Sequence, residues 1–265
     1  MNFIHDILVP ALIFVGLGAL MGVLLAVATK LFHVKKDERA EEIVSCLPGA
    51  NCGGCGYAGC SALADAIVAG EAKVSSCTVG GAEVASKIAG IMGVEAGKTV
   101  RMRAQVMCSG THSNSKKKYI YSGAADCAAA SKLGGGDKLC PNGCIGLGTC
   151  VAHCPFDAIH VENGIAKVDN SRCRGCGICA STCPKGVIRL IPFDSAVWVG
   201  CMSHDNGRTV RSYCDVGCIG CKLCEKNCPS GAIKVDGNVA AIDYDKCTGC
   251  GICAEKCPRK IIHKI

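Results

Sequence analysis

Residues 173–184 read CRGCGICASTCP. The spacing C-x2-C-x2-C-x3-C-P recurs as CIGCKLCEKNCP at 218–229 and as CTGCGICAEKCP at 247–258. Cysteines this close together suit several sulfur atoms converging on one metal centre, whereas disulfide pairing would leave one of the 25 cysteines over. Three copies of a run that ligates [4Fe–4S] clusters therefore predict iron bound by cysteine thiolates.

A duplication surrounds these runs. From Cys127 onward the cysteines repeat with a constant offset of 74 residues, so that Cys127 matches Cys201 and Cys173 matches Cys247. The residues between the cysteines repeat as well, since GCIG at 143–146 matches GCIG at 217–220. Self-similarity of this kind indicates a duplicated structural unit.

Each unit contains a predicted β-hairpin. The segments 158–169 and 232–243 alternate like short strands, and Asn163-Gly164 and Asp236-Gly237 are typical turn dipeptides. We therefore expect an α+β protein with two tandem domains like the bacterial two-cluster ferredoxins. The expected boundaries are 127–200 and 201–265.

The cysteine runs also predict which ligands share a cluster. In bacterial two-cluster ferredoxins the fourth cysteine of each run serves the neighbouring cluster. This crossing is irregular at one place, because Leu147 stands where the repeat has Cys221, and Cys140 is the nearest replacement. The expected sets are Cys218, Cys221, Cys224 and Cys257; Cys247, Cys250, Cys253 and Cys228; Cys173, Cys176, Cys179 and Cys154; and Cys140, Cys144, Cys150 and Cys183.

A fifth site precedes the duplication. Residues 51–60 read NCGGCGYAGC, and another cysteine follows 17 positions later. Glycines between the sulfurs let the backbone wrap closely around a cluster, although a zinc site would use four such cysteines too. Helices are expected at 61–69 and 82–93, within a small [4Fe–4S] domain over 34–95 followed by a linker at 96–126. The expected ligands are Cys52, Cys55, Cys60 and Cys77.

Five cysteines remain outside these five [4Fe–4S] clusters. Their spacing matches no recognisable ligand pattern. Four of them could hold a sixth centre, and the alternative is that all five are ordinary buried thiols. They are Cys46, Cys108, Cys127, Cys201 and Cys214.

An apolar segment stands at the amino terminus. Residues 7–29 carry no charge and are long enough to span a membrane. Asp6 is the only formally charged side chain before them, whereas Lys30, Lys35 and Lys36 follow closely. The positive-inside rule then predicts a single-pass anchor (1–33) in the bacterial cytoplasmic membrane, with the amino terminus outside and the clusters on the cytoplasmic side. A signal peptide would instead have its basic residues first.

The composition limits the functions that this chain can have. The formal charge of +7 omits the clusters, and five of them at about −2 each would bring the total to about −3. The basic residues therefore do not indicate a nucleic-acid partner. Since no flavin or dinucleotide motif is visible, hydride chemistry is expected to belong to other proteins.

The order of these parts resembles a known family. An apolar helix, then residues 51–60, then ferredoxin units is similar to the B subunits of Rnf complexes, the ion-translocating ferredoxin:NAD⁺ oxidoreductases. The resemblance implies an electron-transfer subunit of a translocase, which takes electrons from reduced ferredoxin while flavoproteins and multi-span membrane subunits carry out hydride chemistry and Na⁺ or H⁺ pumping. The alternatives are an accessory complex that keeps an iron–sulfur regulator reduced, and the iron–sulfur subunit of a membrane dehydrogenase.

Overall fold

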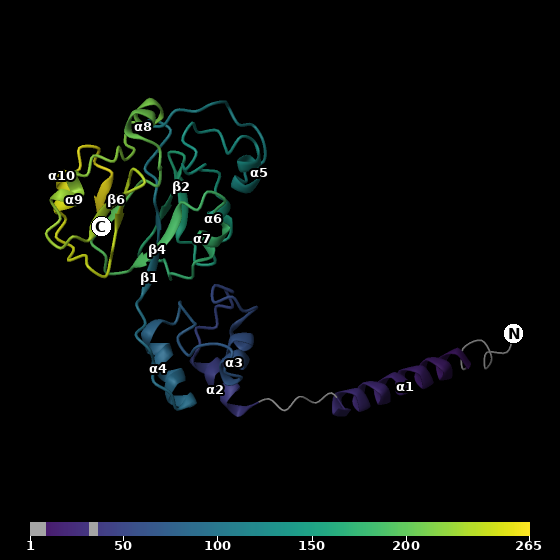
Figure 1. Ribbon diagram of the computed structural model, residues 1–265. Coiled ribbons are helices and arrows are strands. Elements are labelled where there is room, and N and C mark those ends of the chain that lie inside the picture. Colours follow the sequence, from purple (N-terminus) through teal and green to yellow (C-terminus); the bar gives the residue numbers. More distant parts are fainter. Residues whose placement is uncertain (1–8, 32–36) are drawn as a thin grey trace.

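The computed structural model of this chain describes residues 9–31 and 37–265 (Figure 1). Its first element is the helix α1 (Val9–Leu31), of 23 residues. The stretch Ala11–Lys30 has a mean hydropathy of 2.6 and is not buried against any other part of the protein, so it is long and apolar enough to cross a membrane. Asp6, Lys35 and Lys36, on which the predicted orientation depends, lie outside the described residues.

Three helices form a small domain after α1. They pack around apolar side chains that are almost fully buried, including Ile43, Leu63 and Ile88. The last helix ends at Gly93, whose φ of 65° is in the left-handed region that glycine adopts without a steric penalty. The expected helices at 61–69 and 82–93 agree with two of these elements to within one residue. The three helices are α2 (Glu38–Cys46), α3 (Cys60–Val68) and α4 (Gly81–Met92).

The first ferredoxin unit is built on two antiparallel strand pairs. The strand β1 pairs with β4, and β2 pairs with β3 as a hairpin. Ala104, Ile159 and Ile188 bring the two pairs together in one core. The elements are β1 (Met102–Val106), α5 (Cys127–Lys132), α6 (Thr149–Ala152), β2 (Ile159–Glu162), β3 (Ile165–Val168), α7 (Ile178–Thr182) and β4 (Ile188–Pro192).

The second unit repeats this topology. The strand β5 pairs with β8, β6 pairs with β7, and Val197, Ile233 and Ile261 are central to a separate core. Together with the helical content, this confirms the α+β class with two ferredoxin-like units. The elements are β5 (Val197–Val199), α8 (Gly207–Tyr213), α9 (Leu223–Lys226), β6 (Ile233–Asp236), β7 (Val239–Ile242), α10 (Ile252–Lys256) and β8 (Ile262–Lys264).

The two hairpins turn at equivalent positions. In the first, Asn163 and Gly164 have φ values of 49° and 75°, as a two-residue turn between twisted strands requires. In the second, the turn is formed by Gly237 and Asn238, with φ values of 51° and 68°. Asp236, expected in the turn, is the last residue of β6.

Both units begin earlier in the chain than the repeat indicates. The strand β1 lies within the segment 96–126 that was expected to be a linker, and β5 ends before residue 201. Each is hydrogen-bonded to the last strand of its unit, which favours starts close to residues 101 and 196. The constant cysteine offset could not reveal these strands because they contain no cysteine.

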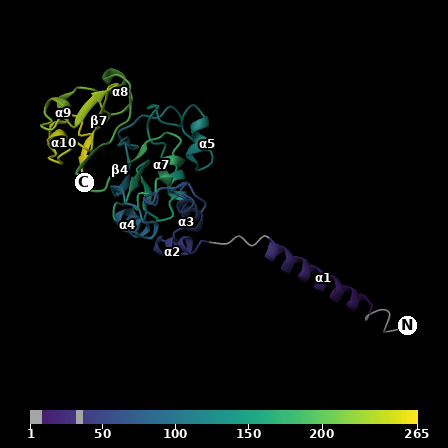
Figure 2. The same ribbon diagram turned by 60° about the horizontal axis from the view of Figure 1, so that its bottom comes forward.

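The helical domain lies beside the first unit. Both views place α2, α3 and α4 next to that unit and away from α9 and α10 (Figures 1 and 2). The contact is close, because a Cβ atom at Gly54 would be 2.6 Å from the backbone oxygen of Cys176. Glycine at position 54 therefore allows the two cysteine loops to touch.

Candidate iron–sulfur sites

The second unit has two cavities, each bordered by four cysteines. The empty space at each, including the part open to solvent, is about 330 Å³ and 310 Å³. In both, three thiols come from one run and the fourth comes from the other run, so the structure brings the two expected sets together. The first cavity has Cys218, Cys221, Cys224 and Cys257, and the second has Cys228, Cys247, Cys250 and Cys253.

A residue in the left-handed conformation shapes each run. It follows the second cysteine directly and precedes a short helix that carries the third. It is Gly177 in the first unit (φ 83°), and Lys222 (φ 59°) and Gly251 (φ 74°) in the second. This conformation reverses the chain so that three sulfurs within seven residues face one cavity. The glycines adopt it readily, whereas Lys222 does so at a cost.

A third expected set gathers in the first unit, below the helical domain. The pKa of the Cys179 thiol is raised to about 12, first by burial and then by Cys176 and the other nearby thiols. Backbone N–H groups already point at two of the sulfurs: Ala104 donates to Sγ of Cys173 and Ala158 to Sγ of Cys154, both at 3.4 Å. The set comprises Cys154, Cys173, Cys176 and Cys179.

The irregular site differs from the expected one. Its cavity, of about 360 Å³, has Cys127 as its fourth thiol, while Cys140 borders a different cavity. Leu147 packs against the small core formed by Cys127, Ala130 and Ile145. The structure thus places Cys140 away from the cavity where the sequence led us to expect it, because α5, a helix that the repeat alignment did not reveal, carries Cys127 to that cavity. The thiols at this cavity are Cys127, Cys144, Cys150 and Cys183.

The position of Cys127 is fixed by hydrogen bonds. Its N–H donates to Oγ1 of Thr149 at 2.6 Å, and that hydroxyl donates to Oδ1 of Asp126 at 2.6 Å. Asp126 also begins α5 by accepting the N–H groups of Ala128 and Ala129. These bonds hold the pKa of the Asp126 carboxyl below its usual value. The start of α5 is thereby tied to α6, which carries Cys150.

The helical domain contributes the remaining expected set. The pKa of Cys77 is raised, chiefly by burial and further by Cys60 and Cys55. Asn51, with a left-handed φ of 44°, accepts the N–H of Cys60 through Oδ1 at 2.8 Å and closes the loop. Cys52, the remaining member, lies near Cys176 of the first unit.

The four leftover cysteines Cys108, Cys140, Cys201 and Cys214 border a further cavity of about 400 Å³, between the two ferredoxin units. Only Cys46 stands apart, packed against the core of the helical domain. No sequence pattern singled out Cys108, although it follows β1 by two residues just as Cys201 follows β5.

These thiols fit a polynuclear cluster better than a single ion. Within residues 9–31 and 37–265, no three Cys, His, Asp or Glu side chains meet closely enough to ligate one metal ion. The sulfurs instead surround cavities, as four-iron clusters require. Burial raises the pKa of Cys144 to about 11 and that of Cys150 to about 12, so these groups are neutral thiols until a metal displaces their protons.

The fold and these cavities define an iron–sulfur protein of the ferredoxin class. Residues 47–79 match the family model described as "Putative Fe-S cluster", and residues 142–187 and 217–261 match the 4Fe-4S dicluster domain. Each ferredoxin match lies within one of the two structural units and covers its cysteine runs. The expected [4Fe–4S] domains are therefore confirmed.

Similar proteins have long matching stretches. The chain is 46% identical to the B subunit of the Na⁺-translocating ferredoxin:NAD⁺ oxidoreductase complex of Acetobacterium woodii, over 92% of this chain and 73% of the relative. It is 45% identical to the B subunit of the ion-translocating oxidoreductase complex of Methanosarcina acetivorans (87% and 88%). It is 42% identical to the B subunit of the proton-translocating ferredoxin:NAD⁺ oxidoreductase complex of Clostridium ljungdahlii (92% and 85%). The chain belongs to the family of B subunits of these Rnf-type complexes.

Proposed function

We propose that this chain is the subunit that accepts electrons from reduced ferredoxin and relays them within a membrane complex that reduces NAD⁺ and pumps Na⁺ or H⁺. The observation that carries the proposal is the group of five four-cysteine sites in a chain of the B-subunit family. When bound, [4Fe–4S] clusters supply one-electron carriers. The chain itself supplies thiolate ligands, N–H donors to the sulfurs and a largely apolar surround.

We assign the ligands of the five sites from the cysteine groups described above. Four sets agree with the expected ones. In the irregular site Cys127 takes the place that the sequence had given to Cys140, because Cys127 borders the same cavity as Cys150 and Cys183. The resulting fifth set is Cys127, Cys144, Cys150 and Cys183.

Neighbouring sites lie close together, which supports a relay. Cys150 of the irregular site is near enough to Cys179 of the next site to raise its thiol pKa. Cys176 of that site is in turn near Cys52 of the helical domain. Three sites therefore lie in a row: the irregular site, the other site of the first unit, and the site of the helical domain that follows α1.

The second unit offers a surface where a soluble partner could approach. Of the cysteines, Cys221 and Cys250 are the two that are exposed, and both belong to this unit. The residue of the first unit equivalent to Cys250, Cys176, is partly buried and lies against Gly54. Exposed Lys222 and Lys246 flank the open loops. These features support a small, transient and salt-sensitive contact with ferredoxin at the second unit.

We also propose that α1 spans the bacterial cytoplasmic membrane with its amino terminus outside, so that the iron–sulfur domains face the cytoplasm. Lys30 in the last turn of α1 supports this orientation. Alkaline phosphatase fused before residue 1 should be active in cells, and the same enzyme fused after residue 265 should be inactive. The reverse pattern would contradict the orientation.

The relay function is tested with the anaerobically purified full chain in detergent. Reduced ferredoxin should bleach the broad visible absorbance of the protein, whereas NADH alone should not. The reason is that hydride removal from NADH needs a flavin or an equivalent site, and this chain has no motif for one. Rapid bleaching by NADH without another protein present, or none by ferredoxin, would overturn the proposal.

A further inference from the structure

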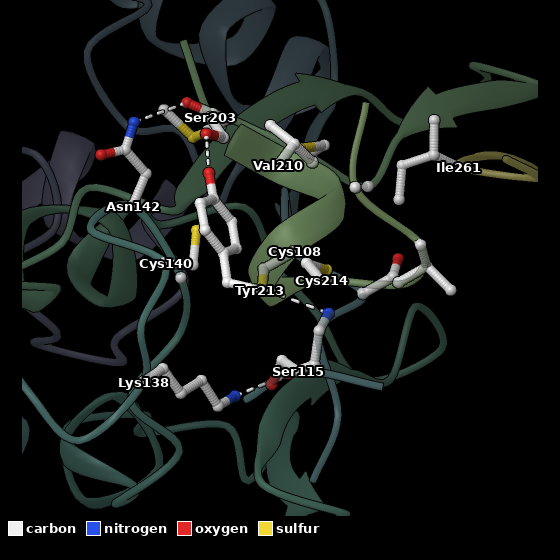
Figure 3. A pocket seen from close by; sticks show the side chains of 18 of the residues that line it. Cys108, Ser115, Lys138, Cys140, Asn142, Ser203, Val210, Tyr213, Cys214 and Ile261 are labelled. Atoms are coloured by element: carbon white, nitrogen blue, oxygen red, sulfur yellow. Dashed lines mark hydrogen bonds between the residues drawn. The ribbon is translucent and has the colours of Figure 1, made fainter. Parts of the chain in front are cut away.

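Four cysteines outside the five sites meet at the cavity between the two ferredoxin units. The cavity is lined by residues of both units, whereas the cysteine-lined cavities described above each lie within one unit. Figure 3 shows three of the cysteines grouped at one end of α8, among the buried side chains of Val210, Tyr213 and Ile261. The four are Cys108, Cys140, Cys201 and Cys214.

The four sulfurs are arranged with a two-fold pseudosymmetry. Each unit contributes one cysteine two residues after its first strand, Cys108 after β1 and Cys201 after β5. Each unit also contributes one cysteine four residues before its first cluster run, Cys140 and Cys214. The loop after the first strand and the loop before the first cluster run therefore reach the cavity from both units. The contact between the two units places two pairs of equivalent thiols around one cavity.

Backbone N–H groups point at these sulfurs as they do in the five assigned sites. Sγ of Cys108 accepts the N–H groups of Gly110 and Cys144, and Sγ of Cys201 accepts the N–H of Cys218, all at 3.4 Å. Cys144 and Cys218 are equivalent residues of the two units, so the donors obey the same pseudosymmetry. Such donors favour a thiolate over a neutral thiol.

A glycine lies directly beside two of the sulfurs. A Cβ atom at Gly143 would lie 3.7 Å from Sγ of Cys140, and one at Gly217 would lie 3.6 Å from Sγ of Cys214. These glycines are again equivalent positions, and both border the cavity. A side chain there would occupy the space next to the sulfur.

A buried cation borders the same cavity. Lys138 is only 3% exposed, and its Nζ donates to the carbonyl oxygens of Gly110 (2.6 Å) and Gly164 (2.8 Å). None of the ion pairs found among the described residues includes it. A buried ammonium group without a carboxylate is costly unless another negative charge is near. Four thiolates around iron and sulfide supply about −2.

A second cation approaches from the other unit. Nη2 of Arg259 donates to the carbonyl oxygen of Cys214 at 2.8 Å, and its charge opposes the rise that burial causes in the pKa of the Cys214 thiol. Lys138 borders this cavity, whereas Arg259 borders the neighbouring cavity of Cys218 and is hydrogen-bonded to Cys214 beside this one, so positive charge is near the four thiols from both units. This balance suits an anionic group better than it suits four neutral thiols.

We propose that Cys108, Cys140, Cys201 and Cys214 ligate a sixth [4Fe–4S] cluster, held jointly by the two ferredoxin units. This proposal extends the proposed function, because a sixth cluster would be a further one-electron carrier. It rests on a separate set of cysteines, so it can fail while the five-cluster relay stands. Two disulfides or a zinc ion would be the other uses of four such thiols. With this assignment, Cys46 is the one cysteine of the chain without a cluster.

The test is the iron content of the full chain and of matched variants, purified anaerobically. The wild type should contain about 24 iron and 24 sulfide per chain, because six clusters have four of each. Cys140→Ala and Cys214→Ala should each lower both numbers to about 20, and the double variant should stay at about 20, because both cysteines serve one cluster. Cys46→Ala is the control and should remain at about 24.

A second double variant separates this cavity from the irregular site. Cys140→Ala combined with Cys127→Ala should fall to about 16 iron, since two clusters are lost. A wild type with about 20 iron would overturn the sixth cluster and leave the relay intact. The sixth cluster would also be overturned if the Cys214→Ala variant kept all its iron while the Cys140→Ala variant lost about four iron per chain. Zinc in place of iron throughout would overturn both proposals. The iron content of the wild type decides between five and six clusters by itself, so the test does not depend on the folding of any variant.

Discussion

The two ferredoxin units provide four thiols at equivalent cavities in different ways. In the second unit Cys221 comes from within its own run, whereas the equivalent residue of the first unit is Leu147. There the fourth thiol is Cys127, which comes from α5 in an extra stretch of about 20 residues between β1 and the first run. The comparison teaches that a cavity within a rigid scaffold can be completed from a distant segment, provided that hydrogen bonds fix that segment.

The two units also differ in what covers them. The loop around Cys176 is in contact with the helical domain at Gly54, while the equivalent Cys250 is exposed. The first unit therefore has partners within the chain on two sides, the helical domain and the second unit. The second unit keeps Cys221 and Cys250 exposed, which suits the proposed contact with a soluble electron donor.

The largest expected effect concerns the origin of the fourth thiol. Cys127→Ser should remove about four iron per chain, and Cys221→Ser should do the same in the second unit. Adding Leu147→Cys to the Cys127→Ser variant should restore the iron, because the first unit then has the ligand pattern of the second. Iron and sulfide analysis with EPR spectra of the reduced protein measures this. Full iron in Cys127→Ser would show that the irregular cavity has another ligand.

The next effect concerns the covered face of the first unit. Gly54→Ala would place Cβ 2.6 Å from the backbone oxygen of Cys176, so the helical domain must shift, at a cost of about 1–3 kcal/mol. Hydrogen exchange should become faster at residues 174–178 and stay unchanged at the equivalent 248–252. Gly97→Ala, at a position with open space around it, is the control. Equal exchange in both variants would mean that the two loops do not touch.

A smaller effect is expected where α5 is tied to α6. Thr149→Val keeps the shape of the side chain but leaves the buried N–H of Cys127 without its acceptor, which costs about 1–2 kcal/mol. Iron should then be released to a chelator faster from this site than from the others. Leu223→Val at the equivalent exposed position of the second unit should change little. If both variants release iron at the wild-type rate, the hydrogen bond does not hold α5 in place.

The smallest effect concerns the open face. Lys222→Glu should slow reduction by ferredoxin a few-fold at low ionic strength and less at high salt, because the charge acts on the encounter. Stopped-flow measurement of the bleaching gives the rate constant. Lys132→Glu, an exposed change on α5 of the first unit, is the control. A larger effect from Lys132→Glu would move the ferredoxin contact to the first unit.

Much of this architecture was predictable because the relevant signals are local. A run such as 173–184 encodes its own loop, left-handed residue and short helix, and Asn163-Gly164 encodes a turn. The family and the ferredoxin units were therefore predicted correctly. The hairpin of the second unit was misplaced by one residue, because Gly237-Asn238 and Asp236-Gly237 are both acceptable turn dipeptides.

The fourth thiol of the irregular site could not be obtained in this way. A constant offset paired Cys127 with Cys201, yet the structural equivalent of Cys201 is Cys108, which lies 93 residues before it rather than 74. The extra residues carry Cys127 to one cavity and leave Cys140 for another. Only the pairing of β1 with β4 makes this equivalence visible, and that pairing joins segments that are more than 80 residues apart.

The most direct test of this account is the position of every iron cluster in the full chain. Anomalous diffraction at the iron absorption edge, from anaerobically grown crystals, locates the clusters without reference to any assignment. We predict six peaks, one of them between the units and surrounded by Cys108, Cys140, Cys201 and Cys214, and another in contact with Cys127. A structure in which Cys140 contacts the cluster of Cys150 and Cys183, with no iron between the units, would contradict it.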